Sequence, residues 1–245
     1  MAITTSNGWN ACSTATTDGL LPPRHGRPQT MTELTPDLLL KAYAIGVFPM
    51  ADDRNAEEIF WVDPDHRGIV PLDQFHVPRS LRKVLRRGTF TVTVDRAFAE
   101  VIAACAEAAP DRRNTWINTQ IEAAYVGLHR AGHAHSVECW ADDKLVGGLY
   151  GVRQAGVFFG ESMFSRVTDA SKVALTHLVA RLICGRFRLL DTQFITDHLQ
   201  RFGAVEVPRA VYHKLLGDAL GVEADFYSLP EGDEAEFVQS MTQMS

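Results

Sequence analysis

Three polar residues accompany two apolar, strand-like runs in the C-terminal half of the chain. Glu161 comes just after the run VFFG, and Asp191 and Gln193 lie in the run FRLLDTQ. Side chains alternate along a strand, so the Asp191 and Gln193 side chains are expected to share one face. If the two strands are neighbours, two carboxyl groups and an amide converge, which suits the binding of a small polar reactant. Alternatively, Asp191 caps a helix and Glu161 is a solvated loop acid.

Apolar residues are predicted to form a floor beneath these polar groups. The helical run after residue 169 is apolar over one broad face, and the strand before Glu161 adds a further apolar side chain. A mostly apolar pocket with a few convergent polar groups is typical of a small-ligand site. The predicted floor consists of Phe158, Leu175, Leu178 and Leu182.

The elements that must position these residues alternate between strands and helices. Strand-like runs cover residues 89–94, 134–141, 145–152 and 157–160, and the last three are separated by the turn sequences DDK and RQAG. Such turns join antiparallel strands. Helical periodicity begins at residues 36, 98 and 118 and again after residue 169. We therefore predict an α+β fold with a mixed, mostly antiparallel sheet and helices on both faces.

Composition and the two ends of the chain limit the class of protein. The 245 residues are 46% hydrophobic with a net charge of -6, so the charge of the whole chain does not indicate a nucleic-acid binder. No apolar run approaches the roughly 18 residues that span a bilayer. The four cysteines form no C-x-x-C pair, and a reducing cytoplasm is expected. Residues 1–30 are predicted to be disordered, with Met31 as an alternative start, and residues 223–245 to be an acidic, solvated tail.

One helical stretch, HVPRSLRKVLRR, concentrates positive charge in this acidic chain. A helix would place its cations on one face and its leucines on the other. Such a face can bind a phosphate backbone, or it can be a solvated surface with no function. The cations are Arg79, Arg82, Lys83, Arg86 and Arg87.

Histidines and tryptophans offer weaker signals. Gly132 separates His129 from His133 and His135, and no acid or cysteine nearby completes a ligand set, so structural or surface roles are expected instead of a metal site. Trp61 and Trp116 lie in loop-like segments. Each can stack on a base or fill the joint between two domains.

The segments FWVDPDHRG, LVGGLYG, FFGESMFS, DASKVAL and LLDTQFITDHLQRFGA occur in order between about residue 36 and residue 216. This combination resembles the bacterial leucyl/phenylalanyl-tRNA–protein transferase family. The resemblance implies a small N-terminal domain, placed at residues 31–72, and a larger catalytic domain of the acetyltransferase superfold, placed at residues 73–222.

The resemblance also implies an activity: transfer of Leu, Phe or sometimes Met from aminoacyl-tRNA to the N-terminal Arg or Lys of a protein, which marks that protein for N-end-rule degradation. An aminoacyl ester is already activated, so neither a cofactor nor a metal is expected, and the reaction is mainly one of positioning. A monomer in the cytoplasm, without membrane contact, is expected. By the same analogy, Asp191 polarises Gln193, Gln193 orients the attacking amine, and Glu161 holds either the cationic acceptor or the terminal ribose.

The resemblance adds Leu190 to the floor, which would take the transferred side chain. An enzyme that serves tRNAs for different amino acids cannot rely on their anticodons, so the basic helix is expected to bind the tRNA backbone through its phosphates. The resemblance assigns four residues to the aminoacyl group and the terminal adenosine: Tyr43, Met50, Trp116 and Tyr125. Four residues depart from the family pattern: Met50 stands where Trp is frequent, Phe60 precedes Trp61 where a Trp pair is common, Phe159 replaces Cys and Asp169 replaces Asn.

Two alternative functions remain open. An acyl-CoA-dependent N-acyltransferase would share the superfold, but it would need a Gly-rich pyrophosphate loop where this chain has SRVTDASKVAL. A non-catalytic tRNA-binding module would keep the basic helix but would not need Asp191 and Gln193 together.

Overall fold

A seven-stranded sheet forms the centre of the structure, a computed structural model that describes residues 34–108, 114–230 and 233–244. The predicted disorder of residues 1–30 and the alternative start at Met31 lie outside these residues. The strand order is β4-β5-β6-β7-β8-β3-β9, and every neighbouring pair is antiparallel except β7 and β8. The strands are β3 (His66–Val70), β4 (Thr91–Val94), β5 (Ala134–Ala141), β6 (Lys144–Gln154), β7 (Val157–Ser165), β8 (Leu189–Gln193) and β9 (Val205–Pro208).

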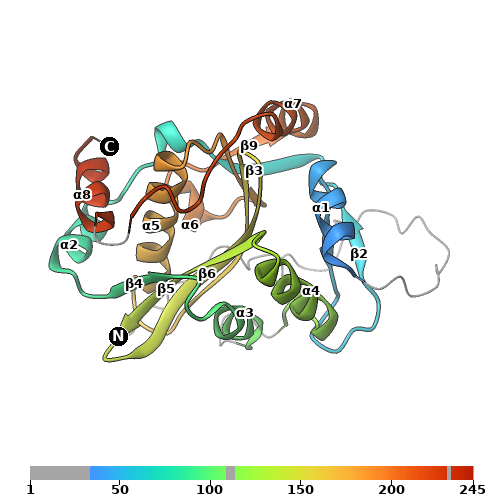
Figure 1. Cartoon of the computed structure of the whole chain (residues 1–245), viewed down its shortest axis with the longest axis horizontal. Helices are drawn as coiled ribbons and strands as arrows, with labels where there is room; N and C mark the ends of the chain where they lie inside the picture. Colours follow the sequence, from blue (N-terminus) through green and yellow to red (C-terminus); the bar gives the residue numbers. More distant parts are fainter. Residues whose placement is uncertain (1–33, 109–113, 231–232, 245) are drawn as a thin grey trace.

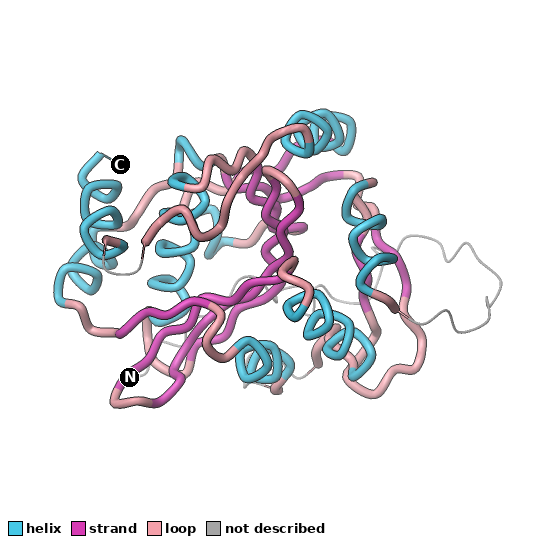
Figure 2. The backbone as a smooth tube through the Cα atoms, in the orientation of Figure 1, coloured by secondary structure: helices cyan, strands magenta, loops and turns pink. Residues whose placement is uncertain are grey.

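Helices cover both faces of this sheet, so the predicted α+β class is confirmed (Figures 1 and 2). Side chains from α1, α3, α4 and α7 pack in one apolar cluster, and side chains from α2, α5, α6 and α8 pack in the other. We call the first face the tyrosine face and the second the α5 face. The helices are α1 (Pro36–Ala44), α2 (Arg79–Arg87), α3 (Phe98–Ala106), α4 (Thr119–Arg130), α5 (Ala170–Cys184), α6 (Asp197–Gln200), α7 (Arg209–Leu220) and α8 (Glu234–Met244), with a 3-10 turn η2 at Leu72–Gln74.

The N-terminal part of the described chain is a helix followed by a small two-stranded sheet. Thr35 caps α1 by accepting a hydrogen bond from the Leu38 backbone N–H at 3.3 Å, and Pro36 occupies the first turn, as the sequence predicts. β1 (Phe48–Met50) and β2 (Phe60–Val62) pair antiparallel. The next strand, β3, does not belong to this small sheet; it lies between β8 and β9 of the large one. The predicted 31–72 segment therefore contributes a strand to the main sheet.

The C-terminal segment is packed against the molecule, so the prediction of a solvated tail is wrong for the residues described. Phe226, Leu229, Val238 and Met241 are buried in the apolar cluster on the α5 face. Glu234 begins α8 and accepts a hydrogen bond at 2.8 Å from Arg181 Nη2 on α5, and a second links it to His177. The prediction was based on the acidic composition of this segment and did not take its spaced apolar residues into account. In the structure, α8 packs against α5 and lies beside α2 (Figure 1).

Candidate active site

Glu161 reaches the tyrosine face because β7 contains a bulge. The strand runs on through Ser165, so Glu161 lies within it and not after it, which corrects the sequence expectation. Gly151 of β6 pairs with Gly160, whereas Tyr150 pairs with Ser162, which leaves Glu161 as an extra residue. A bulge turns a side chain out of the regular alternation, and here it aims the carboxyl group between α1 and α4.

Two tyrosines surround the Glu161 carboxyl group. Tyr43 of α1 donates a hydrogen bond to Oε1 at 2.6 Å, and Tyr125 of α4 donates to Oε2 at 3.0 Å. The two phenolic oxygens also contact each other. All three side chains are buried. The cluster therefore joins two helices and one strand through a single carboxyl group.

Burial raises the pKa of Glu161 from its usual value near 4.5 to about 8, and the nearby Asp191 charge adds to the rise. Hydrogen bonds from Tyr43 and Tyr125 and the charge of Arg67 oppose it without cancelling it. Burial also raises the pKa values of both tyrosines well above 10. The shift makes Glu161 easier to protonate near neutral pH than an exposed carboxyl group.

Asp191 lies on the neighbouring strand, and the structure confirms that β7 and β8 are adjacent, with Phe159 opposite Asp191. Arg67 of β3 binds both carboxylate oxygens: Nε lies 2.9 Å from Oδ1 and Nη2 lies 2.6 Å from Oδ2. Tyr212 of α7 donates to Oδ2 at 2.7 Å. The backbone N–H of Gln193 donates to Oδ1 at 2.8 Å.

Arg67 is an arginine enclosed by aromatic rings. Its guanidinium carbon lies 4.6 Å from the centre of the Phe48 ring and 4.5 Å from that of Tyr212. Its Nη1 donates to the Gly46 carbonyl at 3.0 Å, in the turn after α1. Burial lowers the pKa of Arg67, but the charge and hydrogen bonds of Asp191 raise it by a larger amount. The net shift of the pKa is upward, and the guanidinium stays charged.

Gln193 does not continue the regular strand. Its φ is +54°, in the left-handed region that non-glycine residues rarely occupy, and the β3–β8 register shifts between Gly68 and Ile69. The alternation that predicted a common face for Asp191 and Gln193 therefore does not apply to its side chain. Gln193 is 6% exposed, and among the described residues its Nε2 atom has no hydrogen-bond partner.

The other predicted residues divide between the two faces of the sheet. Tyr43, Met50, Trp116 and Tyr125 belong to the cluster of the tyrosine face. The backbone N–H of Ala51, which follows Met50, donates to the Trp116 carbonyl at 3.2 Å, so these two segments lie side by side. The predicted floor is buried in the cluster of the α5 face, with the sheet between it and the two tyrosines. Its residues are Phe158, Leu175, Leu178, Leu182 and Leu190.

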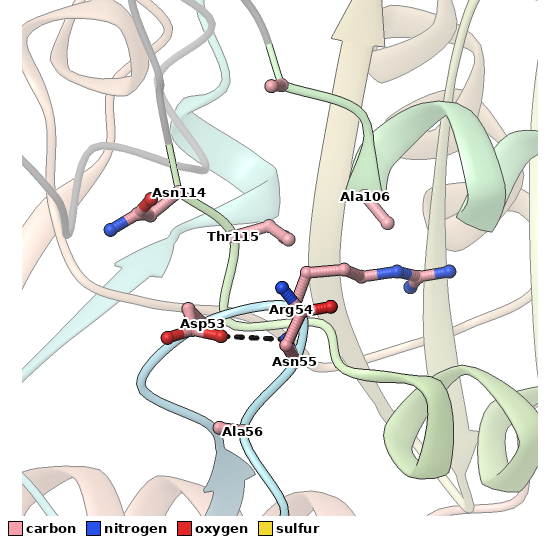
Figure 3. A pocket seen from close by; sticks show the side chains of 8 residues that line it. Asp53, Arg54, Asn55, Ala56, Ala106, Asn114 and Thr115 are labelled. Atoms are coloured by element: carbon pink, nitrogen blue, oxygen red, sulfur yellow. Dashed lines mark hydrogen bonds between the residues drawn. The ribbon is translucent and has the colours of Figure 1, made fainter.

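A polar pocket of about 480 Å³ lies next to the Trp116 segment and not over the floor. Figure 3 shows the loop of residues 53–56 on one side and Thr115 and Ala106 on the other. Arg54 stabilises this loop by donating to the Ile117 carbonyl at 3.0 Å and by pairing with Glu122 of α4. None of the predicted site residues lines this pocket.

The basic helix forms as α2 and presents most of its charges to solvent. Arg79, Lys83, Arg86 and Arg87 are exposed, whereas Arg82 is half-buried and its Nε donates to the Val77 carbonyl at 2.8 Å. α2 packs against α5 and α8, away from the two tyrosine-bearing helices (Figure 1). Four cations thus remain available on this surface.

The predicted histidines and Trp61 occupy defined positions. His129 contacts the Ala134 carbonyl at 2.9 Å, and His135 contacts Asp95 at 2.7 Å. In the part of the chain that the structure describes, no three metal-binding side chains gather. Trp61 lies in strand β2, not in a loop, and is 41% exposed. Within the same described ranges, no helix has the length and hydrophobicity needed to cross a membrane.

Sequence reasoning missed Arg67 and Tyr212. Arg67 occurs in HRGIV, where a charged side chain interrupts an apolar strand, and that interruption was the available signal. Tyr212 carries no such signal, because a tyrosine on an amphipathic helix is ordinary. Both became visible only through their contacts with Asp191.

Comparison with known proteins agrees with the motif resemblance. Residues 69–217 match the family profile described as "Leucyl/phenylalanyl-tRNA protein transferase", and residues 32–65 match the profile of its N-terminal domain. Relatives named leucyl/phenylalanyl-tRNA–protein transferase are 63% identical over 194 residues in Rhizorhabdus wittichii (79% of this chain, 78% of the relative) and 58% identical over 204 residues in Nitrobacter winogradskyi (83% and 91%). A third, from Rhodospirillum rubrum, is 59% identical over 196 residues (80% and 92%). The chain belongs to the leucyl/phenylalanyl-tRNA–protein transferase family.

Proposed function

We propose that this protein transfers Leu, Phe or Met from aminoacyl-tRNA to the α-amine of proteins that begin with Arg or Lys, and so marks them for degradation. Its family membership supports the reaction class. The observation that carries the proposal is the pair of buried carboxyl groups on adjacent strands, of which one accepts hydrogen bonds from two tyrosines and the other pairs with Arg67. We propose further that the protein acts as a monomer.

The chemistry is the aminolysis of an ester. The acceptor α-amine attacks the ester carbonyl carbon, a C–N bond forms, and the C–O bond to the terminal ribose breaks. The amine loses a proton and the departing ribose oxygen gains one, so no net proton is consumed. An α-amine has a pKa near 8, so part of it is already neutral at physiological pH. The protein therefore has to orient two reactants and help one proton move.

We assign Glu161 to the terminal ribose and not to the cationic acceptor. A carboxyl group with a pKa of about 8 is mostly protonated at neutral pH, so it is a poor counter-ion but a good hydrogen-bond donor. Its proton can pass to the ribose oxygen as the ester bond breaks. The proton that the attacking amine loses can then return to Glu161, because the pKa of an α-amine is close to the raised pKa of this carboxyl group, and the proton count balances.

The remaining predicted residues bind the donor. The pairing of β7 with β8 stops at Phe159 and Asp191, just before Glu161 and Gln193. The proposed path of the transferred side chain runs between the two strands at this point, from the tyrosine face to the floor residues on the α5 face, and an apolar slot of this kind suits Leu, Phe and Met. Met50 and Trp116, which lie on adjacent segments, contact the terminal adenosine. The exposed cations of α2 contact tRNA phosphates, which position the donor without reading its sequence.

The test is the transfer of radiolabelled leucine from Leu-tRNA by the purified protein. A peptide with a free N-terminal Arg should become labelled, whereas the same peptide with an acetylated N-terminus should not, because the attacking amine is blocked. A third peptide beginning with Gly tests the need for a cationic side chain. No labelling of the free Arg peptide would overturn the proposal, and labelling from leucyl-CoA instead would favour the acyl-CoA alternative.

A further inference from the structure

Asp191 has no free capacity to polarise the Gln193 side chain. Its two oxygens accept hydrogen bonds from Arg67 Nε and Nη2, from the Tyr212 hydroxyl and from the Gln193 backbone N–H. The contact with Gln193 thus goes to the backbone and not to the side-chain amide. The relay from Asp191 to the Gln193 side chain, which the family resemblance implied, is not the arrangement found in this chain.

The Gln193 backbone is held in an unfavourable conformation, and its side chain is left unpartnered. A φ of +54° is unfavourable for a non-glycine residue and persists only where neighbours enforce it. The bond from the Gln193 N–H to Asp191 is one such constraint. A buried amide nitrogen without a partner among the described residues is uncommon in proteins and points to a ligand that completes it.

We propose that Arg67 is a positioning residue for the transfer reaction: through Asp191 it fixes the Gln193 backbone so that the Gln193 side-chain amide donates to the ester carbonyl oxygen. Negative charge develops on that oxygen as the C–N bond forms and disappears as the bond to ribose breaks. A preorganised N–H donor stabilises this charge. The inference rests on the proposed aminoacyl transfer and assigns its carbonyl-binding group.

The geometry of Arg67 explains why an arginine is needed. Two parallel N–H groups hold the two Asp191 oxygens, and this fixes the rotation of the carboxylate as well as its position. The Phe48 and Tyr212 rings confine the plane of the guanidinium between them. A lysine would keep the charge but offer no fork, so Asp191 could rotate and release the Gln193 N–H.

The main test is a double-mutant cycle between Arg67→Lys and Gln193→Ala, with turnover measured at saturating Leu-tRNA. Gln193→Ala should lower kcat by about a hundredfold, as the loss of a carbonyl-directed donor does. Arg67→Lys alone should lower kcat by about tenfold or more, with KM for Leu-tRNA nearly unchanged. In the Gln193→Ala background, Arg67→Lys should change kcat by less than about twofold, because its effect passes through Gln193. Equal fold-losses in both backgrounds would overturn the inference.

Arg181→Lys is the matched control. Arg181 is 2% exposed and Arg67 is 1% exposed, so both are buried. Arg181 is likewise paired with a carboxylate, that of Glu234, but on the opposite face of the sheet. Both Arg181→Lys and Arg67→Lys should lower the urea concentration at the midpoint of unfolding. Arg181→Lys should nevertheless keep the kcat of the wild type. A drop in kcat as large as that of Arg67→Lys would show that loss of any buried arginine fork impairs the enzyme.

Tyr212→Phe is a second, smaller change that tests the same inference. It removes one hydrogen bond to Asp191 and retains the ring that stacks on Arg67. It should lower kcat by about tenfold, whereas Tyr150→Phe should have no effect, because the buried Tyr150 hydroxyl has no partner among the described residues. Wild-type turnover by Tyr212→Phe would contradict the inference. If the wild-type protein itself fails to transfer leucine, the proposed function fails instead, so the two failures are distinct.

Discussion

Glu161 and Asp191 are buried carboxyl groups on neighbouring strands, and they differ in their partners. Asp191 faces a cation, Arg67, at 2.6 Å, whereas Glu161 accepts hydrogen bonds from two neutral phenols. Neutral donors compensate only part of the cost of burying a charge. One carboxyl group can thus anchor a backbone while the other holds a proton.

The Glu161 titration predicts an unusual dependence of stability on pH. The folded protein keeps a proton up to a pKa of about 8, whereas the unfolded chain loses it near 4.5. The stabilisation is therefore complete below about pH 4.5 and is lost as the pH rises towards 8. Glutamine does not titrate, so Glu161→Gln should not lose stability in this way. The difference in the free energy of unfolding between the variant and the wild type should therefore grow by about 1 kcal/mol per pH unit between about pH 4.5 and 8.

Urea unfolding of the wild type and Glu161→Gln at about pH 5.5, 6.5 and 7.5 measures this difference. If the free energy of unfolding depended on pH in the same way for both proteins, Glu161 would be charged in the folded state at neutral pH. That result would also remove the reason for assigning it to the ribose.

Leu178 tests the assignment of the floor. Replacing it with Ala should enlarge the pocket, so the preference for Phe over Leu, measured as a ratio of kcat/KM values, should rise at least about threefold. The same change should lower the free energy of unfolding by about 2–5 kcal/mol, because Leu178 is fully buried. Val238→Ala is the control, since Val238 is buried in the same cluster but lies on α8. An equal change of preference in both variants would place Leu178 outside the pocket.

At the scale of elements, α2 is the part of the molecule best suited to bind tRNA. Four exposed cations follow one another along nine residues, and Gly88, with a φ of +58°, ends the helix behind them. Arg82 is different, because its bond to the Val77 carbonyl stabilises the start of the helix. A test of tRNA binding should therefore leave Arg82 in place.

Removing Lys83 and Arg87 together should raise KM for Leu-tRNA and flatten its salt dependence. These residues lie one turn apart on the exposed side of α2. Each ion pair with a phosphate that the substitutions remove should reduce the log–log salt slope by somewhat less than about one unit. A leucyl-adenosine donor without the tRNA stem should be used as before. The control is Arg130→Ala with Lys214→Ala, which removes two exposed cations elsewhere. An equal loss of activity with both donors would make α2 a structural element only.

At the scale of the whole molecule, the small N-terminal sheet has no core of its own. Leu39, Tyr43, Phe48 and Val62 belong to the same apolar cluster as Phe159 of the large sheet. Two buried polar links, Tyr43 to Glu161 and Arg67 to the Gly46 carbonyl, cross the same joint. The described parts should therefore unfold together.

Fluorescence and circular dichroism can check this cooperativity. A variant that keeps Trp61 as its sole tryptophan reports on β2, and far-UV circular dichroism reports on the whole secondary structure. The two urea transitions should have the same midpoint. An earlier fluorescence transition would show that the N-terminal sheet separates before the main sheet unfolds.

Local patterns in the sequence were sufficient for the class of fold and for the candidate polar residues. The Thr35 cap, the strand alternation and the turns DDK and RQAG depend on neighbouring residues, so they could be read without the fold. The same holds for the motifs that carry the family resemblance, and for the basic face of α2. The apolar residues of the C-terminal segment were misread because its acidic composition outweighed their spacing.

Packing was required for the arrangement of the site. Tyr43 and Glu161 are 118 residues apart in the chain, and Arg67 and Asp191 are 124 apart. Whether such residues meet depends on strand order and register, and a one-residue shift moves a side chain to the other face. The bulge at Glu161 and the left-handed backbone of Gln193 are shifts of this kind. Local periodicity assumes a regular strand, so it could not place either side chain or identify Arg67 as the partner of Asp191.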